Sequence, residues 1–197
     1  MCINSLEEAL KNPDGVYKLN LSSQGLISVP ASISKFKNLV VLNLSNNQIA
    51  NLPAEVFSLS NLIELNAGNN KLTAIPAQIC SLKKLESLSL NGNEITSVGS
   101  DISCATNLQK LFLQNNNINS VSSDIENLKN LRYLYLFGNS LTKIPSEICN
   151  LSQLQVLLLA NNKLKEPLKG LEKLTHLRYY SEDGQLLDKN VLALKHL

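Results

Sequence analysis

The feature that most constrains the fold of this chain is a repeat of 23 residues. Asparagine recurs at this step without a miss, at Asn47, Asn70, Asn93, Asn116, Asn139 and Asn162. Apolar residues recur at fixed offsets around each Asn, in the order L-x-x-L-x-L-x-x-N-x-L, and most copies continue with x-x-[LIV]-P-x-x-[IV]-x-x-L. Seven copies fit residues 16–176, and a partial eighth begins at Leu177. A period of this length indicates stacked repeats.

The apolar spacing within one copy predicts two kinds of local structure. The L-x-L step has period two, which is typical of a strand with one buried face. The later Val, Ile and Leu residues lie three or four positions apart, which suits a short helical or 3-10 segment. One copy cannot bury its own apolar face, so the copies stack. We therefore predict an α/β solenoid, with a parallel sheet on the concave face and short helical segments on the convex face.

In this pattern the chain resembles leucine-rich repeat (LRR) proteins, over residues 16 to about 181. The L-P-x-x-[IV] half is similar to the 23-residue class found in small bacterial LRR proteins and in the Ras-suppressor and plant intracellular groups. The resemblance implies that the repeated Asn is buried and satisfies loop backbone groups, so we interpret the six Asn residues as a structural ladder rather than a binding site. The chain departs from the pattern where Gly99 and Ser122 replace proline, and at Pro167-Leu168.

The two ends of a stacked array need caps, because a terminal repeat exposes its core. Ser5 and Glu8 form a capping-box sequence, which predicts an N-terminal helical cap within residues 1–15. With the solenoid over residues 16–181, residues 182–197 remain for a C-terminal cap.

The C-terminal cap is predicted to be a helix. Asp183-Gly184 indicates a turn, and Leu187, Val191 and Leu194 then recur at helical spacing. With both caps assigned, we expect the chain to be complete rather than a fragment of a larger protein.

Strand alternation assigns positions 3, 5 and 7 of each copy to the concave face. The first four copies place mostly small and polar residues there, whereas five of the nine aromatic residues of the chain fall on this face from copy five onward. The candidate partner-binding residues on copies five to eight are Lys110, Phe112, Arg132, Tyr133, Tyr135, Phe137, Val156, Leu158, Arg178 and Tyr179.

Exposed aromatic patches mark interaction sites, and Tyr, Phe and Arg are enriched in interface cores. We therefore expect a protein or peptide partner on this face, with Lys110, Arg132 and Arg178 selecting an acidic rim. Two alternatives remain open. The aromatic residues could serve only as cross-strand packing, or they could form the seam of a weak homodimer of an otherwise monomeric chain.

Composition and motifs disfavour other partners and activities. The net charge is only +2, with 17% charged residues, so we expect no nucleic-acid partner. No apolar run is long enough to cross a bilayer, so we expect no membrane insertion. No phosphate-binding glycine loop, nucleophile elbow or H-E-x-x-H pattern occurs. We expect no catalytic residue, no cofactor and no metal, and hence a non-enzymatic interaction module.

The four cysteines are Cys2, Cys80, Cys104 and Cys149, and none has zinc-site spacing. Cys80 and Cys104 lie in adjacent copies at slots 19 and 20, so a disulfide between them is an alternative to the free thiols that we expect. Free thiols favour a reducing compartment, and the first residues do not resemble a signal peptide. We therefore favour a cytoplasmic location, for example as a phosphatase-regulator-like subunit. The alternative is an exported bacterial protein that engages host surface proteins.

Overall fold

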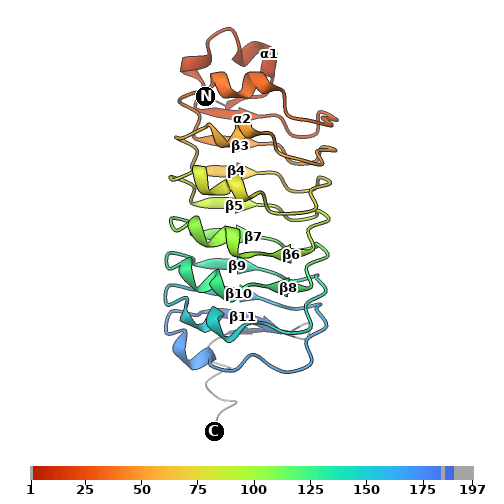
Figure 1. Ribbon diagram of the computed structural model, residues 1–197, viewed down its shortest axis with the longest axis vertical. Helices are drawn as coiled ribbons and strands as arrows, with labels where there is room; N and C mark the ends of the chain where they lie inside the picture. Colours follow the sequence, from red (N-terminus) through yellow and green to blue (C-terminus); the bar gives the residue numbers. More distant parts are fainter. Residues whose placement is uncertain (1, 183–184, 189–197) are drawn as a thin grey trace.

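The structure, a computed structural model, describes residues 2–182 and 185–188, and within them the repeats stack into an elongated solenoid (Figure 1). Ten strands form one sheet in the order β1-β2-β3-β4-β5-β7-β9-β10-β11-β12. Eight of these strands come from the repeats: β2 Lys18–Asn20, β3 Val41–Asn43, β4 Glu64–Asn66, β5 Ser87–Ser89, β7 Lys110–Phe112, β9 Tyr133–Tyr135, β10 Val156–Leu158 and β11 Tyr179–Glu182. Neighbouring repeat strands pair in parallel and in register, so residues 23 positions apart lie side by side. The predicted parallel-sheet solenoid is confirmed.

Short helices line the side of the solenoid opposite the sheet (Figure 1). They are α2 Ala54–Phe57 and the 3-10 helices η2 Ala31–Lys35, η3 Ala77–Ser81, η4 Ser100–Cys104, η5 Ser123–Asn127, η6 Ser146–Asn150 and η7 Leu171–Lys173. The repeated proline is the N-cap residue of η2, η3, η6 and α2. Proline suits this position because its φ is fixed and because a backbone N–H here would have no acceptor within the helix.

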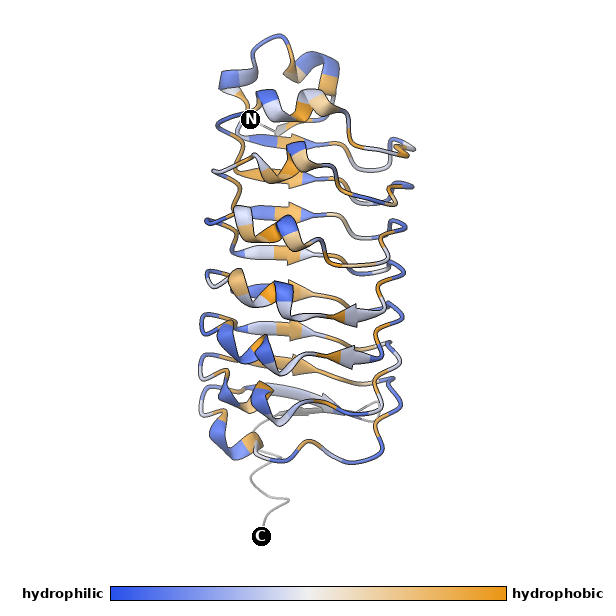
Figure 2. Ribbon diagram, viewed as in Figure 1, coloured by the Kyte–Doolittle hydropathy of each residue, from blue (hydrophilic) through white to orange (hydrophobic). Residues whose placement is uncertain are grey.

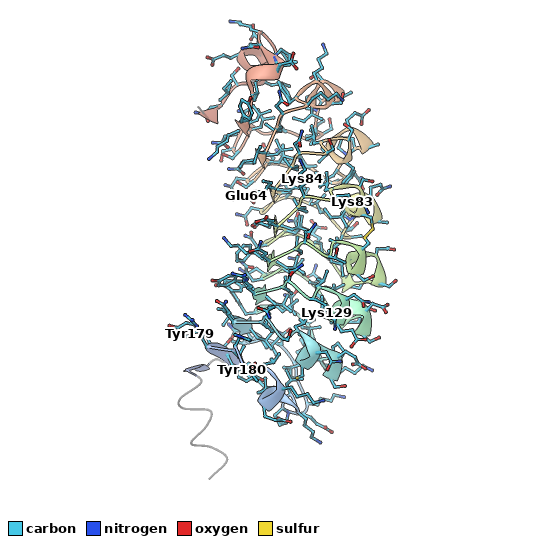
Figure 3. All side chains as sticks on the ribbon, turned by 90° about the vertical axis from the view of Figure 1, so that its left-hand side faces the viewer. Glu64, Lys83, Lys84, Lys129, Tyr179 and Tyr180 are labelled. Atoms are coloured by element: carbon cyan, nitrogen blue, oxygen red, sulfur yellow. A yellow bond between two sulfur atoms is a disulfide. The ribbon has the colours of Figure 1, made fainter. Side chains whose placement is uncertain are left out.

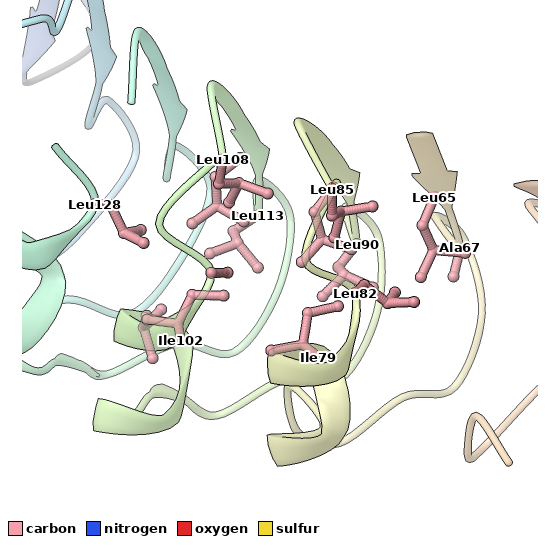
Figure 4. Packing of buried hydrophobic residues seen from close by; sticks show 14 of the residues in the cluster. Leu65, Ala67, Ile79, Leu82, Leu85, Leu90, Ile102, Leu108, Leu113 and Leu128 are labelled. Atoms are coloured by element: carbon pink, nitrogen blue, oxygen red, sulfur yellow. The ribbon is translucent and has the colours of Figure 1, made fainter. Parts of the chain in front are cut away.

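Between these two sides runs one continuous apolar core. The inward leucines of the strands and the apolar residues of the helices are buried, and Leu42, Leu88, Leu111 and Leu134 have no exposed surface. Figure 4 shows leucines of successive repeats stacked in the interior with Ile79 and Ile102 of η3 and η4. Figure 2 shows apolar segments alternating with polar ones along each repeat, which is the pattern that lets one face of every strand be buried.

The Asn ladder lies at the turn that follows each strand. Asn70 is typical of it. Its Oδ1 accepts the backbone N–H of Ile49 at 3.0 Å, and its Nδ2 donates to the carbonyls of Leu44 and Ala67 at 3.0 and 3.1 Å. The other five ladder residues repeat this arrangement, and Asn162 alone among the six is half-buried rather than buried. Each side chain therefore bonds to the backbone of the preceding repeat and of its own.

The residue before each ladder Asn adopts a left-handed conformation. These residues are Asn46, Asn69, Gly92, Asn115, Gly138 and Asn161, with φ between 54° and 67°. Ser23 has the same conformation before Gln24, which stands at the Asn position of the first copy. Only Gly, Asn and, less often, other small polar residues adopt this region readily. A Cβ added at Gly92 or Gly138 would also overlap the side-chain amide of the Asn 23 residues earlier. The turn thus restricts the residue type at two successive positions, the left-handed residue and the ladder Asn. Only the Asn belongs to the leucine and asparagine pattern.

A second, two-stranded sheet appears where the repeated proline is missing. Strands β6 Ser97–Val98 and β8 Ser120–Val121 pair in parallel on the convex side. The backbone N–H of Ser122, at the proline position, donates to the carbonyl of Val98 at 2.8 Å. Proline has no N–H to make this bond. The replacement of proline by Ser122 therefore adds a main-chain link between repeats four and five.

The N-terminal cap has the predicted helix at its centre. Helix α1 spans Leu6–Ala9, and the Oγ of Ser5 accepts the backbone N–H of Glu8 at 3.4 Å. Ala9 is buried against the first repeat, and the 3-10 helix η1, Pro13–Gly15, follows. Strand β1, Cys2–Ile3, adds an edge to the sheet by pairing in parallel with β2.

The prediction of a C-terminal cap helix is wrong for residues 185–188. They form strand β12, Gln185–Asp188, which pairs antiparallel with β11. The last repeat strand would otherwise leave a row of backbone groups unpaired, and an antiparallel strand satisfies them directly. The turn expected at Asp183-Gly184, and Val191 and Leu194 of the expected helix, lie outside the described residues.

The expectation of free thiols is also wrong for one pair of cysteines. Cys80 and Cys104 form a disulfide between the ends of η3 and η4, with their Cα atoms 5.3 Å apart. The slots differ by one residue, but the stacked 3-10 helices bring both Cα atoms within the range that a disulfide requires. Cys149 is free and buried.

Candidate interaction surface on the concave face

The concave face of repeats five to eight is formed by β7, β9, β10 and β11. Register places Phe112, Tyr135 and Leu158 side by side in one row. Lys110 and Tyr133 begin a second row, which continues with Val156 and Tyr179. These rows, with Phe137 after β9, bring together the aromatic residues that alternation assigned to this face. We call this set, Phe112, Tyr133, Tyr135, Phe137, Leu158 and Tyr179, the aromatic cluster.

Tyr135 lies at the centre of the aromatic cluster. Its ring meets that of Phe112 edge to face, with 4.9 Å between centroids, and it lies 6.4 Å from the ring of Phe137. These three residues are half-buried, because part of each ring packs on its neighbours. Edge-to-face pairs contribute about 0.5–1.5 kcal/mol beyond burial, so part of the aromatic surface already stabilises the sheet.

Exposure differs among the remaining candidates. Tyr179 is 45% exposed, whereas Val156 is only 8% exposed and contributes mainly to packing. Leu158 and Tyr133 are half-buried, and the Tyr133 hydroxyl donates to Oε1 of Gln155 at 3.5 Å. Figure 3 shows Tyr179 projecting from the sheet side of the solenoid, well away from the labelled lysines on the turns.

Three exposed cations flank the aromatic cluster. Lys110, Arg132 and Arg178 are exposed, and none of them has an ion-pair partner within the described residues. The one ion pair found there joins Lys169 to Glu166 at 3.9 Å, between two highly exposed side chains of repeat seven. The basic side chains at the cluster are therefore available to an external acidic group.

A groove adjoins the aromatic cluster on the side of the earlier repeats. It has a volume of about 320 Å³ and runs over β3, β4 and β5 to the ring of Phe112. Sequence reasoning left this part of the face unassigned, because its residues are small and polar. No single repeat carries a signal for the groove, because its lining residues come from four repeats.

The described residues hold no group of three or more His, Cys, Asp or Glu side chains that could bind a metal. In the same part of the chain, no helix is long and apolar enough to cross a membrane. Burial, assisted by the Glu172 carboxylate and opposed by Lys173, raises the pKa of the Cys149 thiol. A buried thiol of raised pKa is mostly protonated and is a poor nucleophile.

Comparison with known proteins agrees with the fold. The leucine-rich repeat family model matches residues 37–95 and 106–164, more than half of the chain. The chain therefore belongs to the leucine-rich repeat family, whose domains generally act as protein–protein interaction modules. A search of curated proteins finds no match.

Three solved structures show the extent of the likeness. An LRR protein of Leptospira interrogans is 31% identical over 100% of this chain, with a TM-score of 0.73. The LRR ectodomain of a plant receptor kinase from Arabidopsis thaliana, solved with Casparian strip integrity factor 2, is 30% identical over 85% of the chain, with a TM-score of 0.75.

An internalin of Listeria monocytogenes is 23% identical over 92% of the chain, with a TM-score of 0.78, which shows the shared fold alone. This chain spans 63% of the Leptospira chain, 52% of the Listeria chain and 21% of the plant chain.

Proposed function

We propose that this protein is a non-enzymatic binding module whose protein or peptide partner docks on the concave face of repeats five to eight. The observation that carries the proposal is the aromatic cluster, half-buried to exposed, with three unpaired cations at its edge. Aromatic anchors surrounded by charged groups resemble the core and rim of known interfaces. The Arabidopsis relative, solved with Casparian strip integrity factor 2, is a precedent for binding by such a domain.

Substitution of Tyr135 and Phe137 by alanine tests this proposal. Partner capture should be lost in the double variant, while the free energy of unfolding falls by only about 1–2 kcal/mol, as expected for half-buried rings. The matched control is Tyr17→Ala, which removes an aromatic ring that is 54% exposed and lies outside the cluster.

Two results would contradict the proposal. Intact partner capture with a loss of about 3–5 kcal/mol, the cost of truncating a fully buried aromatic residue, would mean that the cluster is sheet packing. A wild-type dimer that the double variant abolishes, seen by sedimentation, would make the cluster a homodimer seam instead.

One observation favours an exported role over a cytoplasmic one. The Cys80–Cys104 disulfide is typical of oxidising compartments, where such bonds form and persist. We therefore favour a partner met outside the cytoplasm, such as a host surface protein, over a phosphatase-like partner within it. Non-reducing mass spectrometry of protein isolated from its native source tests this. A fully reduced pair in that protein would favour the cytoplasmic alternative.

A further inference from the structure

The groove beside the aromatic cluster has a distinct chemistry. Ser87 and Ser89 of β5 form a low floor, and Phe112 of the neighbouring strand β7, the register partner of Ser89, stands beside it as an apolar wall. Glu64 of β4 lines the same groove, and its side chain is exposed. Figure 3 shows Glu64 on the sheet side of the solenoid, the side from which Tyr179 also projects. An apolar wall and a carboxylate thus share one small concavity.

The Glu64 carboxylate is the charged acceptor of this groove. The neighbouring Asn66 and Asn43 also line it, but their Oδ1 atoms accept the backbone N–H groups of Gly68 and Ser45 at 3.0 Å. Glu64 has no ion-pair partner within the described residues. Its negative charge is therefore not neutralised by the chain itself.

Two lysines share the register row of Glu64. Lys18 lies two strands before it and Lys110 two strands after it, so each Cα is roughly 10 Å away at the usual strand spacing. Charges at that separation are largely screened at physiological ionic strength, where the Debye length is about 8 Å. A group in direct contact with the carboxylate is screened much less, so Glu64 decides which charge the groove accepts.

From this geometry we infer that the groove receives a basic side chain, arginine or lysine, of the bound partner. The aliphatic stem lies against Phe112 and over the serine floor, and the cationic head meets the Glu64 carboxylate. Long basic side chains combine an apolar stem with a charged head, which matches the two surfaces of the groove. An arginine head can also stack on the phenyl ring.

This assignment, which rests on the proposed function, gives the docked segment a direction. On the side of the later repeats, the exposed cation Lys110 lies on β7, and the exposed cations Arg132 and Arg178 directly precede β9 and β11. The partner segment therefore places its basic residue over repeats three to five and its acidic residues over repeats five to eight. A segment of reversed polarity would oppose like charges at both places.

The experiment titrates isotope-labelled protein with N-acetyl-L-arginine amide and follows the backbone amides of Ser87, Ser89 and Phe112 by NMR. The matched probe is N-acetyl-L-citrulline amide, which has nearly the same shape without the charge. We expect the arginine probe to shift these resonances and the citrulline probe to bind about two- to fivefold more weakly, the effect of one partly exposed ion pair.

Glu64→Gln should remove this preference, because it keeps the shape of the side chain and deletes the charge. Glu94→Gln, an exposed residue on the turn after the Asn ladder, is the control that raises the net charge by the same one unit and should preserve the preference. Equal binding of the two probes, absence of shifts at the groove, or an unchanged preference in Glu64→Gln would each overturn the assignment. The titration needs no partner, so its result is separate from partner capture by the aromatic cluster.

Discussion

Replacement of Asn116 by alanine tests whether the Asn ladder holds the solenoid together. Asn116 is 7% exposed, and its Oδ1 accepts the backbone N–H of Ile95 at 3.0 Å. Its Nδ2 donates to the carbonyls of Leu90 and Leu113, each at 3.0 Å. Alanine removes these three bonds at once, together with a longer bond from Nδ2 to the carbonyl of Gln114 at 3.4 Å.

The expected loss of unfolding free energy follows from these contacts. A typical intramolecular hydrogen bond contributes about 0.5–1.5 kcal/mol net, and a buried donor left without an acceptor costs about 1–3 kcal/mol. Ile95, whose N–H loses its acceptor, has no exposed surface. Because the two contributions overlap, we expect the free energy of unfolding to fall by about 3–5 kcal/mol.

Urea unfolding followed by circular dichroism measures this loss. Asn107→Ala is the matched control, because Asn107 is exposed and its Nδ2 makes one bond, to the carbonyl of Lys83 at 2.7 Å. It should lose about 1 kcal/mol or less. The slope of the transition must be compared as well as the midpoint, since a repeat array can lose cooperativity. If the two variants lost equal stability, the ladder would not be the structural element described above.

Three further predictions concern the convex side and the cysteines. Ser122→Pro restores the repeat pattern but removes an N–H that bonds to the neighbouring repeat, so it should lower stability by about 1–2 kcal/mol. Gly99→Pro has no such bond to lose and should be neutral or stabilising in the same urea assay. Reduction of the Cys80–Cys104 bond should lower the unfolding free energy by about 3 kcal/mol. The Cys80→Ser/Cys104→Ser variant should have this lower stability with or without reductant, and an equal loss of stability in both proteins on adding reductant would refute the prediction. The Cys149 pKa is raised in the native state, so this thiol stabilises the fold below the unfolded pKa and loses that contribution as pH rises above it. Alkylation of Cys149 should accordingly be slow until the protein unfolds, and rapid native labelling would contradict its burial.

The strands and the core were predictable because one apolar pattern determines them in every copy. The L-x-L step locates β3 and β9 without reference to any other part of the chain. The left-handed position before each ladder Asn was equally readable, since Asn69 and Gly92 are residue types that tolerate positive φ. The spacing of leucine and asparagine alone does not reveal this left-handed position.

A second amide ladder was also readable and was missed. Asn38, Asn61, Asn107 and Asn130 each donate to the carbonyl 24 residues earlier, along the turn that leads into the strand. At the same slot of the last repeat, His176 takes over the contact, with Nδ1 2.9 Å from the carbonyl oxygen of Ser152. The 23-residue step of these asparagines is the signal, and the position explains one histidine without any catalytic role.

Other features depend on three-dimensional stacking and could not be read from spacing. The slots of Cys80 and Cys104 do not give their separation, which the winding of η3 and η4 sets. The spacing of Leu187 with later apolar residues favours a helix, but the unpaired edge of β11 favours a strand. The groove beside Phe112 arises from residues of four repeats and has no single sequence signature.

The disulfide and the additional convex sheet have a mechanical consequence. The disulfide ties repeat three to repeat four, and β6 with β8 ties repeat four to repeat five. A linear array held only by neighbour contacts peels from its ends when it is stretched or heated. In this protein, repeats three, four and five are linked to one another on the convex side, directly behind β4, β5 and β7. The strands that carry Glu64 and Phe112 should thus be the last to separate when the solenoid is pulled from its ends. A partner bound there would contact the stiffest section of the molecule.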